Sequence, residues 1–453
     1  MRLLHAAVCT CAVTLFWCNP ATDNGDGGQD ATPPPPDGNQ TEAGVDAVGP
    51  TDGGADIVLE AETSIPPMKE EWVLPIDMNG NRQAVVSDSA GNVIIAGETS
   101  SNASMFFTKL DPHGKIVWNK SFAGGLDGTG LAVDPSDDIL LVGTAGSSSF
   151  NVGGATLGAG SFVAKFAPNG THMWSKPLVP SNDYAPRVAL ADNGGLVVTG
   201  RLNGTASIAG GQSVSGSNAV YVVKLTSGGA VTWTYTFGLG NDTPRSATSD
   251  GAGGIVFVGD GSLCGASGSN YVAHVDNAGT CTGVVLGDYL TSPLGVAVDP
   301  SGNVFTTTQN GPGSSFCAGD YAFTLAKLDP SLNVLWKKCV SGGVYPQASG
   351  TAILSDDAGS VTLTGSLTAA ADASIDLGGG PITTSGPFVA RFAPDGGYVS
   401  NTLWPTPSYV LPLEMSRAPA QQVYLLGNAN GTLSFGDASI DIDSGGFLAR
   451  QTP

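Results

Sequence analysis

Short apolar runs separated by small polar residues recur along most of the chain. One recurring segment is an apolar strand, a turn of Asp, Ser, Gly or Asn, and a second apolar strand that ends in Gly. It reads AVVSDSAGNVIIAG at 84–97, LAVDPSDDILLVG at 131–143 and VALADNGGLVVTG at 188–200. Looser copies lie at 246–259, 295–307, 352–365 and, with only the second strand clear, 422–427. Such runs, joined by turn residues that tolerate a positive φ, predict β-hairpins.

A second recurring segment alternates with the first. It is a strand that carries one basic residue, then a turn, then a strand that often contains Trp, as in FFTKLDPHGKIVW and FVAKFAPNGTHMW. Its copies begin at residues 106, 162, 221, 271, 323, 388 and 447. Each unit therefore holds four strands, and the units follow at intervals of roughly 45 to 65 residues, which is typical of a β-propeller. The sequence predicts an all-β fold, a β-propeller of about seven four-stranded blades.

The last unit is incomplete, because its strand FLAR at 447–450 ends almost at the chain terminus. A candidate for the missing fourth strand lies at the front of the domain in EEWVLPIDM, 70–78, where Trp72 matches the place of Trp118 in the next unit. We expect this N-terminal strand to complete the last blade and close the ring, which leaves no exposed inner edge. The propeller domain is expected to span 67–453.

These units resemble those of bacterial seven-bladed beta-propeller repeat proteins. The phrases FVAKFAPNG and FVARFAPDG and turns of the VDPSGNV type carry the resemblance. It implies an exported or surface protein without a defined substrate, because propellers host many unrelated activities. LDPHGKIVW is also similar to the tryptophan-docking repeat of quinone-dependent dehydrogenases. The chain is one blade short of that family and has no matching set of cofactor ligands, so no cofactor is expected.

The first residues are typical of an export signal. Arg2 precedes an apolar run that is too short for a comfortable membrane span and is followed by Cys18. Cys18 resembles the lipidated cysteine of a bacterial lipoprotein signal, although Phe16 and Trp17 stand where that pattern has small residues. We expect residues 1–18 to be a lipoprotein-like signal and Cys18 to be lipidated. The protein would then lie in the bacterial cell envelope or at the surface and touch the membrane only through a lipid anchor; a periplasmic or secreted protein is the alternative.

The segment 19–66 contains four consecutive prolines, many Asp and Gly, and few large apolar residues. It cannot bury enough apolar surface to offset the entropy of ordering, so it is expected to be a disordered acidic linker. The formal net charge of the whole chain is −21. Because such a surface repels phosphate backbones, nucleic acid is excluded as a partner.

Four of the seven cysteines lie within the repeats. Cys264 and Cys281 belong to the fourth unit, and Cys317 and Cys339 hold similar places in the fifth. In an exported protein this placement favours disulfides Cys264–Cys281 and Cys317–Cys339, although four cysteines allow three connectivities. Each bridge would contribute about 3 kcal/mol by constraining the unfolded chain.

Three residue patterns suggest sites, and each has a structural reading that we favour. One basic position recurs, at Lys109, Lys165, Lys224, His274, Lys327, Arg391 and Arg450. These cations could attract an anionic ligand, but their stems more often lie between blades while the charged ends reach polar groups. Tryptophans recur after the next turn, at Trp118, Trp174, Trp233 and Trp336, in a register that favours packing between blades. Asp-rich turns at 134–138 and 299–303 offer too few oxygen ligands for calcium and are predicted as hairpin turns.

No motif for nucleophilic or metal-dependent catalysis is present: GxSxG, HExxH and CxxC are all missing. His113, His172 and His274 each lie in or beside a repeat strand or turn. We therefore expect neither catalytic nor metal-binding residues, and no enzyme.

Mid-blade loops rich in Gly, Ser and Thr at 146–160, 203–218 and 367–386 are the variable parts of the repeats. Loops on a rigid scaffold are where binding usually resides. The sequence thus predicts a monomeric binding or scaffold module for a protein or glycan of the cell envelope. The alternatives are a hydrolase or lyase that acts on polysaccharide through carboxylates at the channel mouth, and a passive surface spacer.

Overall fold

The computed structural model describes residues 71–78, 83–99, 104–124, 126–146, 149–179, 186–238, 240, 242–266, 268, 270–286, 291–310, 322–341, 347–368, 374–406, 409–435 and 438–451. Of the two units into which the chain divides, Met1–Asp52 and Gly53–Pro453, only the second contains described residues. The predicted signal, the linker, Cys18 and Cys317 lie outside them.

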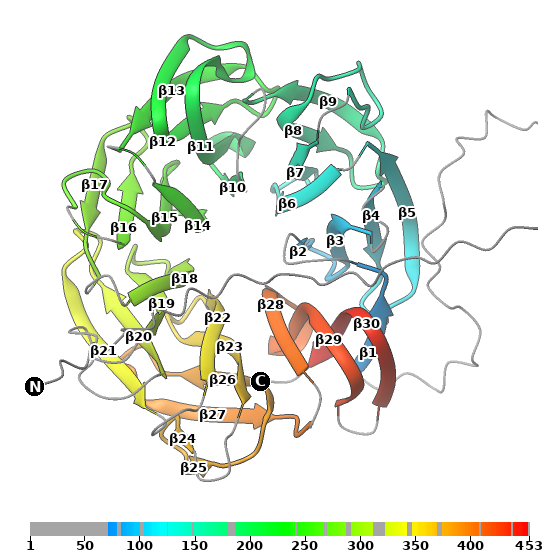
Figure 1. The fold of residues 1–453 in the computed structure, drawn as a ribbon, viewed down its shortest axis with the longest axis vertical. Helices are drawn as coiled ribbons and strands as arrows, with labels where there is room; N and C mark the ends of the chain where they lie inside the picture. Colours follow the sequence, from blue (N-terminus) through cyan, green and yellow to red (C-terminus); the bar gives the residue numbers. More distant parts are fainter. Residues whose placement is uncertain are drawn as a thin grey trace, which may run out of the picture. The chain divides into compact units, whose positions relative to one another are not determined.

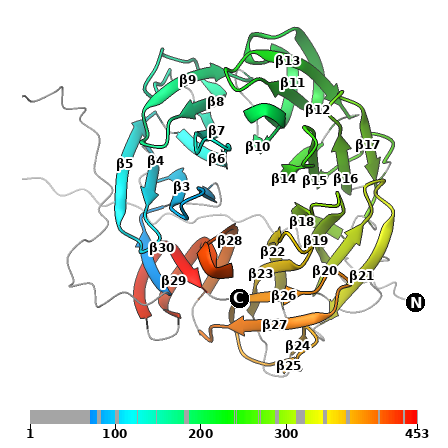
Figure 2. The ribbon, with the colours of Figure 1, turned by 180° about the vertical axis from the view of Figure 1, so that it is seen from behind.

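In the described residues, seven four-stranded antiparallel sheets follow one another around a ring (Figures 1 and 2). We number the blades 1 to 7 by their inner strands, which are β2 (Gln83–Ser87), β6 (Leu126–Val133), β10 (Arg187–Leu190), β14 (Thr243–Ser249), β18 (Thr291–Val298), β22 (Gln347–Ser355) and β28 (Tyr409–Arg417). The second strands are β3 (Val93–Glu98), β7 (Ile139–Ala145), β11 (Leu196–Ser207), β15 (Ile255–Asp260), β19 (Val304–Asn310), β23 (Val361–Thr368) and β29 (Val423–Phe435). The third strands are β4 (Ser104–Leu110), β8 (Gly160–Phe166), β12 (Ser213–Leu225), β16 (Asn270–Val275), β20 (Ala322–Leu328), β26 (Gly386–Phe392) and β30 (Ala438–Gln451). The outer strands are β5 (Ile116–Ala123), β9 (His172–Pro177), β13 (Val231–Phe237), β17 (Cys281–Val284), β21 (Val334–Ser341), β27 (Tyr398–Leu403) and β1 (Trp72–Ile76).

The N-terminal strand closes the ring, as predicted. Strand β1 pairs with β30 in register from Trp72–Arg450 to Ile76–Gly446, and so supplies the outer strand of blade 7. Trp72 faces Arg450 just as Trp118 faces Lys109 in blade 1. Each inner strand contacts the inner strands of both neighbouring blades, including β28 with β2. The predicted fold class, a seven-bladed propeller closed by its N-terminal strand, is confirmed.

The core consists of separate apolar clusters between neighbouring blades. One cluster joins Ile94 and Phe107 of blade 1 to Leu141 and Phe166 of blade 2, and a similar cluster lies at every other blade junction. The second and third strands are therefore covered on both faces. Strands buried on both faces have nearly continuous apolar runs instead of strict alternation, which explains segments such as VIIAG and ILLVG.

A glycine ends the repeated VIIAG-type strand because an aromatic ring lies across it. Gly97 pairs with Phe106, and a Cβ on Gly97 would come within 2.8 Å of that ring. Five further pairs follow the same rule: Gly143–Phe162, Gly200–Tyr221, Gly259–Tyr271, Gly365–Phe388 and Gly427–Phe447. Only blade 5 departs, and there both partners change together, to Thr308 and Thr324.

The remaining elements are short. Strands β24 (Ile375–Asp376) and β25 (Pro381–Ile382) form a small hairpin, and 3-10 helices η1 (Asp192–Gly194), η2 (Ile208–Gly210) and η3 (Pro419–Gln421) lie in turns. No helix among the described residues could span a membrane.

Candidate functional site

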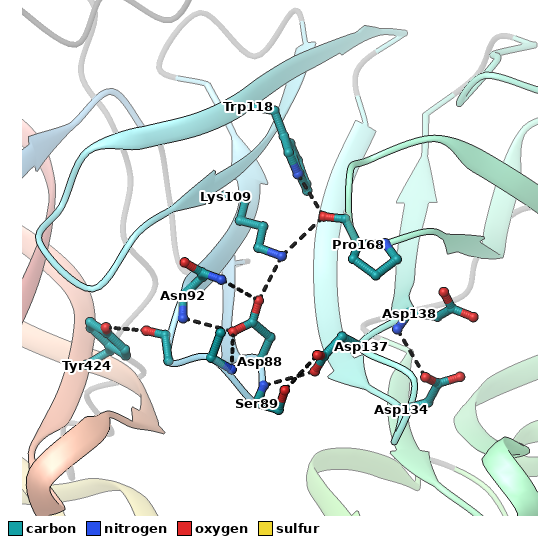
Figure 3. Close-up of polar contacts among 12 residues, drawn as sticks. Asp88, Ser89, Asn92, Lys109, Trp118, Asp134, Asp137, Asp138, Pro168 and Tyr424 are labelled. Carbon is teal, nitrogen blue, oxygen red and sulfur yellow. Dashed lines mark hydrogen bonds and ion pairs between the residues drawn. The ribbon is translucent and has the colours of Figure 1, made fainter.

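The recurring cations hold blades together. In blade 1 the Lys109 ammonium lies 2.7 Å from the Asp88 carboxylate and donates to the Pro168 carbonyl of blade 2 at 3.1 Å (Figure 3). Both side chains are buried, with 6% and 2% of their surface exposed. Burial alone would raise the pKa of Asp88, but hydrogen bonds from Asn92 and Lys109 lower it.

The same pairing recurs in the following blades. The ion pairs are Lys165–Asp134 (2.8 Å), Lys224–Asp192 (2.5 Å), Lys327–Asp299 (3.3 Å) and Arg391–Asp356 (3.3 Å). In blade 4 the His274 ring lies within hydrogen-bond distance of Asp250, at 2.9 Å. Arg450 instead donates to the Pro112 carbonyl of blade 1 at 2.8 Å. The structural reading of the cation positions is thus confirmed: six of the seven contact a carboxylate of their own blade, and Lys109, Lys224, Lys327 and Arg450 reach carbonyls of the next blade.

The tryptophans also reach carbonyls of the next blade, and three of them share the acceptor with a repeated cation. Trp118 Nε1 donates to the Pro168 carbonyl at 3.1 Å, so two donors of blade 1 converge on one acceptor of blade 2 (Figure 3). Trp72, at the ring closure, donates to the Pro112 carbonyl at 3.0 Å. The other bonds are Trp174–Ser227 (3.1 Å), Trp233–Asn277 (3.0 Å) and Trp336–Pro394 (3.2 Å). Packing between blades, as predicted, is their role.

Two junctions lack the tryptophan, each for a structural reason. Blade 4 has Thr282 opposite His274 where other blades have Trp, and the facing turn of blade 5 has Leu332 where other turns have glycine. Leu332 has a φ of 64° and is 3% exposed within the apolar cluster of that junction, so it fills the space of the missing ring. Blade 6 has Ser400 opposite Arg391. A tryptophan at this position would have no turn of blade 7 to bond to, because the third and outer strands of blade 7 come from opposite ends of the chain and are not joined by a turn.

The Asp-rich segments are hairpin turns. Asp134 Oδ1 accepts the backbone amides of Ser136 at 2.8 Å and Asp138 at 3.0 Å, and Asp299 does the same two and four residues onward. These are Asx turns, in which the carboxylate replaces a backbone acceptor. Their other oxygens face the ion pairs described above.

The fourth unit contains the predicted bridge. Cys264, in the mid-blade loop, is bonded to Cys281, the first residue of β17, with Cα atoms 5.5 Å apart. Cys339 is also disulfide-bonded. Its predicted partner Cys317 lies outside the described residues, so that pairing stays a prediction.

The mid-blade segments differ from the predicted loops. Segment 203–218 is not a loop: β11 and β12 continue through it as a hairpin that turns at η2, which buries Ile208 and Ala209. In the other two segments, Phe150, Val152, Ile375 and Leu377 are buried in the clusters between blades. Their apolar residues serve packing, and whether their polar residues form a contact surface stays a prediction.

The centre of the ring contains a cavity of about 920 Å³. Its wall comes mainly from the inner strands β14, β18, β22 and β28 and from the turns that follow β14 and β18. Four consecutive blades, 4 to 7, thus contribute to one concave surface.

Bulges place extra side chains on this wall. In β14 the pairing with β15 passes from Pro244–Gly259 to Ser246–Val258, which leaves Arg245 without a cross-strand partner. Leu294, Thr351 and Leu413 are the extra residues at the matching places in β18, β22 and β28, and all four line the cavity. Bulges re-aim side chains and are frequent beside functional sites.

The sequence contained a signal for these bulges that our sequence reasoning missed. Pro244, Pro293 and Pro412 each stand directly before the extra residue. Proline cannot donate to a ladder, so within a sheet it marks an edge strand or a bulge.

Arg245 is held firmly. Its Nε lies 2.5 Å from Asp260 Oδ2, and its carbonyl accepts a hydrogen bond of 2.8 Å from Arg187 Nε. The side chain remains 43% exposed, and within the described part of the chain its two terminal nitrogens have no hydrogen-bond partner.

Glu414 is the other notable group on the wall. It directly follows the extra residue Leu413 and is half-buried, and no described residue hydrogen-bonds to its carboxyl. Burial raises the pKa of Glu414, and the charge of Arg187 opposes this shift. The other acidic side chains on the wall, Asp250, Asp299 and Asp357, each contact a His, Lys or Arg side chain.

The histidines do not gather around the cavity. His113 lies in an exposed turn, and His172 on β9 packs edge-on against Phe166, where burial lowers the pKa of His172. Of the described histidines, only His274 approaches the wall, through Asp250, in the place that other blades give to Lys or Arg. In the ranges that the structure describes, no three His, Cys, Asp or Glu side chains are arranged to hold a metal ion.

No family model matches the sequence, and no curated protein matches it either. Among solved structures, virginiamycin B lyase from Staphylococcus aureus has a TM-score of 0.49 at 9% identity over 84% of this chain and all of that chain (100%). Polysaccharide lyase Uly1 has a TM-score of 0.45 at 11% identity over 87% and 94%. The Pan2 WD40 domain from Neurospora crassa has a TM-score of 0.44 at 9% identity over 83% and 97%. Likenesses this distant concern the propeller scaffold alone and assign no activity to this chain.

Proposed function

We propose that this propeller is a binding or scaffold module for a protein or glycan, exported to a bacterial cell envelope and tethered there through Cys18. The scaffold itself is the seven-bladed ring described above. Its ligand would bind in the central cavity.

One observation carries the binding proposal: four bulged residues from four consecutive blades line a single cavity. A bulge gives up ladder hydrogen bonds, and these bulges direct the extra side chain to the cavity instead of the core. The extra residues Arg245, Leu294, Thr351 and Leu413 differ in chemistry at equivalent places. A mixed set of charged, hydroxyl and aliphatic groups on a concave wall suits selective recognition.

The test is saturable binding by the immobilised full chain to a panel of envelope proteins and cell-wall glycans. Leu294→Trp would fill part of the cavity with an indole ring and should abolish binding. Leu335→Trp makes the same change on the outer strand β21, where the side chain is 54% exposed, and should leave binding intact. Binding that survives Leu294→Trp but is lost when 374–385 is replaced by Gly and Ser would move the site to the mid-blade loops.

A polysaccharide-acting hydrolase or lyase is a second candidate, and Glu414 is the observation that favours it. A carboxyl with a pKa raised by burial is suited to general acid catalysis. Hydrolysis of glycosidic bonds usually needs two carboxyl groups, however, and the other carboxylates on the wall each contact a His, Lys or Arg side chain. New reducing ends or unsaturated products from bound glycan, lost in Glu414→Gln, would establish the enzyme. Absence of any selective ligand would instead leave the passive spacer.

A further inference from the structure

Arg245 has the features of a preorganised anion receptor. The bulge places it on the cavity wall, Asp260 fixes its Nε, and Arg187 fixes its backbone carbonyl. Its two terminal nitrogens form the edge of the guanidinium that matches the two oxygens of a carboxylate. Little side-chain entropy would remain to be lost on binding, because the ion pair already orients the group.

A structural role does not account for this arrangement. Four of the repeated cations on the third strands, Lys109, Lys224, Lys327 and Arg450, are buried and donate to carbonyls of the next blade. Arg245 instead belongs to an inner strand, and its side chain is 43% exposed. The ion pair with Asp260 lies within blade 4, because β14 and β15 are neighbours in one sheet. The side chain of Arg245 therefore joins no blades, and the link to blade 3 runs only through its backbone carbonyl, which accepts from Arg187.

The rest of the wall is suited to hydroxyl groups. Serine and threonine side chains line it at Ser246, Thr248, Ser249, Ser301, Thr351 and Ser355. Glu414 offers two acceptor oxygens when ionised and has no hydrogen-bond partner among the described residues. A ligand that combines a carboxylate with several hydroxyls would satisfy both Arg245 and Glu414.

We propose that the cavity binds a sugar acid within a glycan, with the ligand carboxylate paired to the guanidinium of Arg245 and ligand hydroxyls bonded to Glu414 and the serine and threonine side chains. This inference rests on the proposed binding function. It goes further by naming the chemical class of ligand and the residue that selects it.

The experiment measures binding of the purified full chain to oligogalacturonate by calorimetry, with fully methyl-esterified oligogalacturonate as the matched neutral ligand. Oligogalacturonate should bind at least about tenfold more tightly than the ester, because charge-assisted hydrogen bonds exceed neutral ones. Added salt should weaken the acid form more than the ester. Arg245→Met should abolish the preference for the acid form, and Arg245→Lys should retain part of it.

Lys115→Met is the control for net charge, since Lys115 is exposed in a turn of blade 1. It should leave the preference unchanged. Equal binding of acid and ester would overturn the inference while the binding function stood. A preference retained in Arg245→Met, at unchanged thermal stability, would overturn the role of Arg245. Tighter binding of poly-L-glutamate than of oligogalacturonate would replace the sugar acid by an acidic peptide.

Discussion

The buried pair of Lys109 and Asp88 gives a sharp test of how the blades are joined. Lys109→Met keeps the aliphatic stem but removes the charge that neutralises Asp88 and one of the two donors to the Pro168 carbonyl. Removing one partner of a buried pair typically costs about 3 to 5 kcal/mol, because the remaining charge is left uncompensated. Asp88 keeps bonds from Ala90 and Asn92, so we expect the lower end, about 3 kcal/mol.

The cost should depend on pH. The folded-state pKa of Asp88 is lowered, so the pair stabilises the fold above the unfolded pKa of the carboxyl and loses that contribution as pH falls through the folded value. The difference between Lys109→Met and the unchanged protein should therefore shrink in acid, where Asp88 is protonated.

The assay is urea unfolding of the unchanged protein, Lys109→Met, Asp88→Asn and the double variant. The double variant leaves no buried charge, so it should cost less than the sum of the single changes, with a coupling of about 1 to 3 kcal/mol. Lys115→Met, in the same blade, should stay within about 0.5 kcal/mol of the unchanged protein. A loss below about 1 kcal/mol in Lys109→Met would place the pair with exposed ion pairs and refute the reasoning.

Three further predictions concern other parts of the ring. Replacing Cys264 and Cys281 by serine opens a loop with a sequence separation of 17 and should cost about 3 kcal/mol in urea unfolding; an unchanged midpoint would contradict this. Leu332→Ala should lower the free energy of unfolding by about 2 to 5 kcal/mol, because it empties a buried site. Leu332→Gly should lower it by no more than the alanine variant, because glycine tolerates the φ of 64°. An alanine variant clearly more stable than the glycine variant would show that the backbone is not strained. Because the folded-state pKa of Glu414 is raised, the fold loses stability as pH rises through it, so Glu414→Gln should raise the melting temperature at neutral pH and not in acid. A gain of equal size at every pH would show that charge burial is not the cause.

The fold could be predicted because its signals are local. An apolar run, a turn with Asp and Gly, and a second apolar run indicate each hairpin. Trp72 identifies the strand that supplies the outer position of blade 7 from the other end of the chain. The disulfide between Cys264 and Cys281 could be predicted for the same reason, since both cysteines lie in one unit.

Other features were missed or misjudged. Segment 203–218 resembles a loop in composition, yet it forms a hairpin because Ile208 and Ala209 find an apolar site between blades 2 and 3. The bulge at Arg245 could be identified only from the pairing register of β14 with β15, although Pro244 was a sequence signal for it.

The sequence by itself determined the strands and the four-stranded units, because these depend on neighbours a few residues apart. It also indicated about seven blades and the closing strand, because the units repeat and Trp72 matches the tryptophan of the other outer strands. Only the tertiary structure decided which charges are buried and what faces the centre. Pro168 accepts from Lys109 and Trp118 across a blade junction, and the charge of Arg187 in blade 3 acts on Glu414 in blade 7. Such relations join residues far apart in the chain, and the closing of the ring, not local propensity, brings them within range.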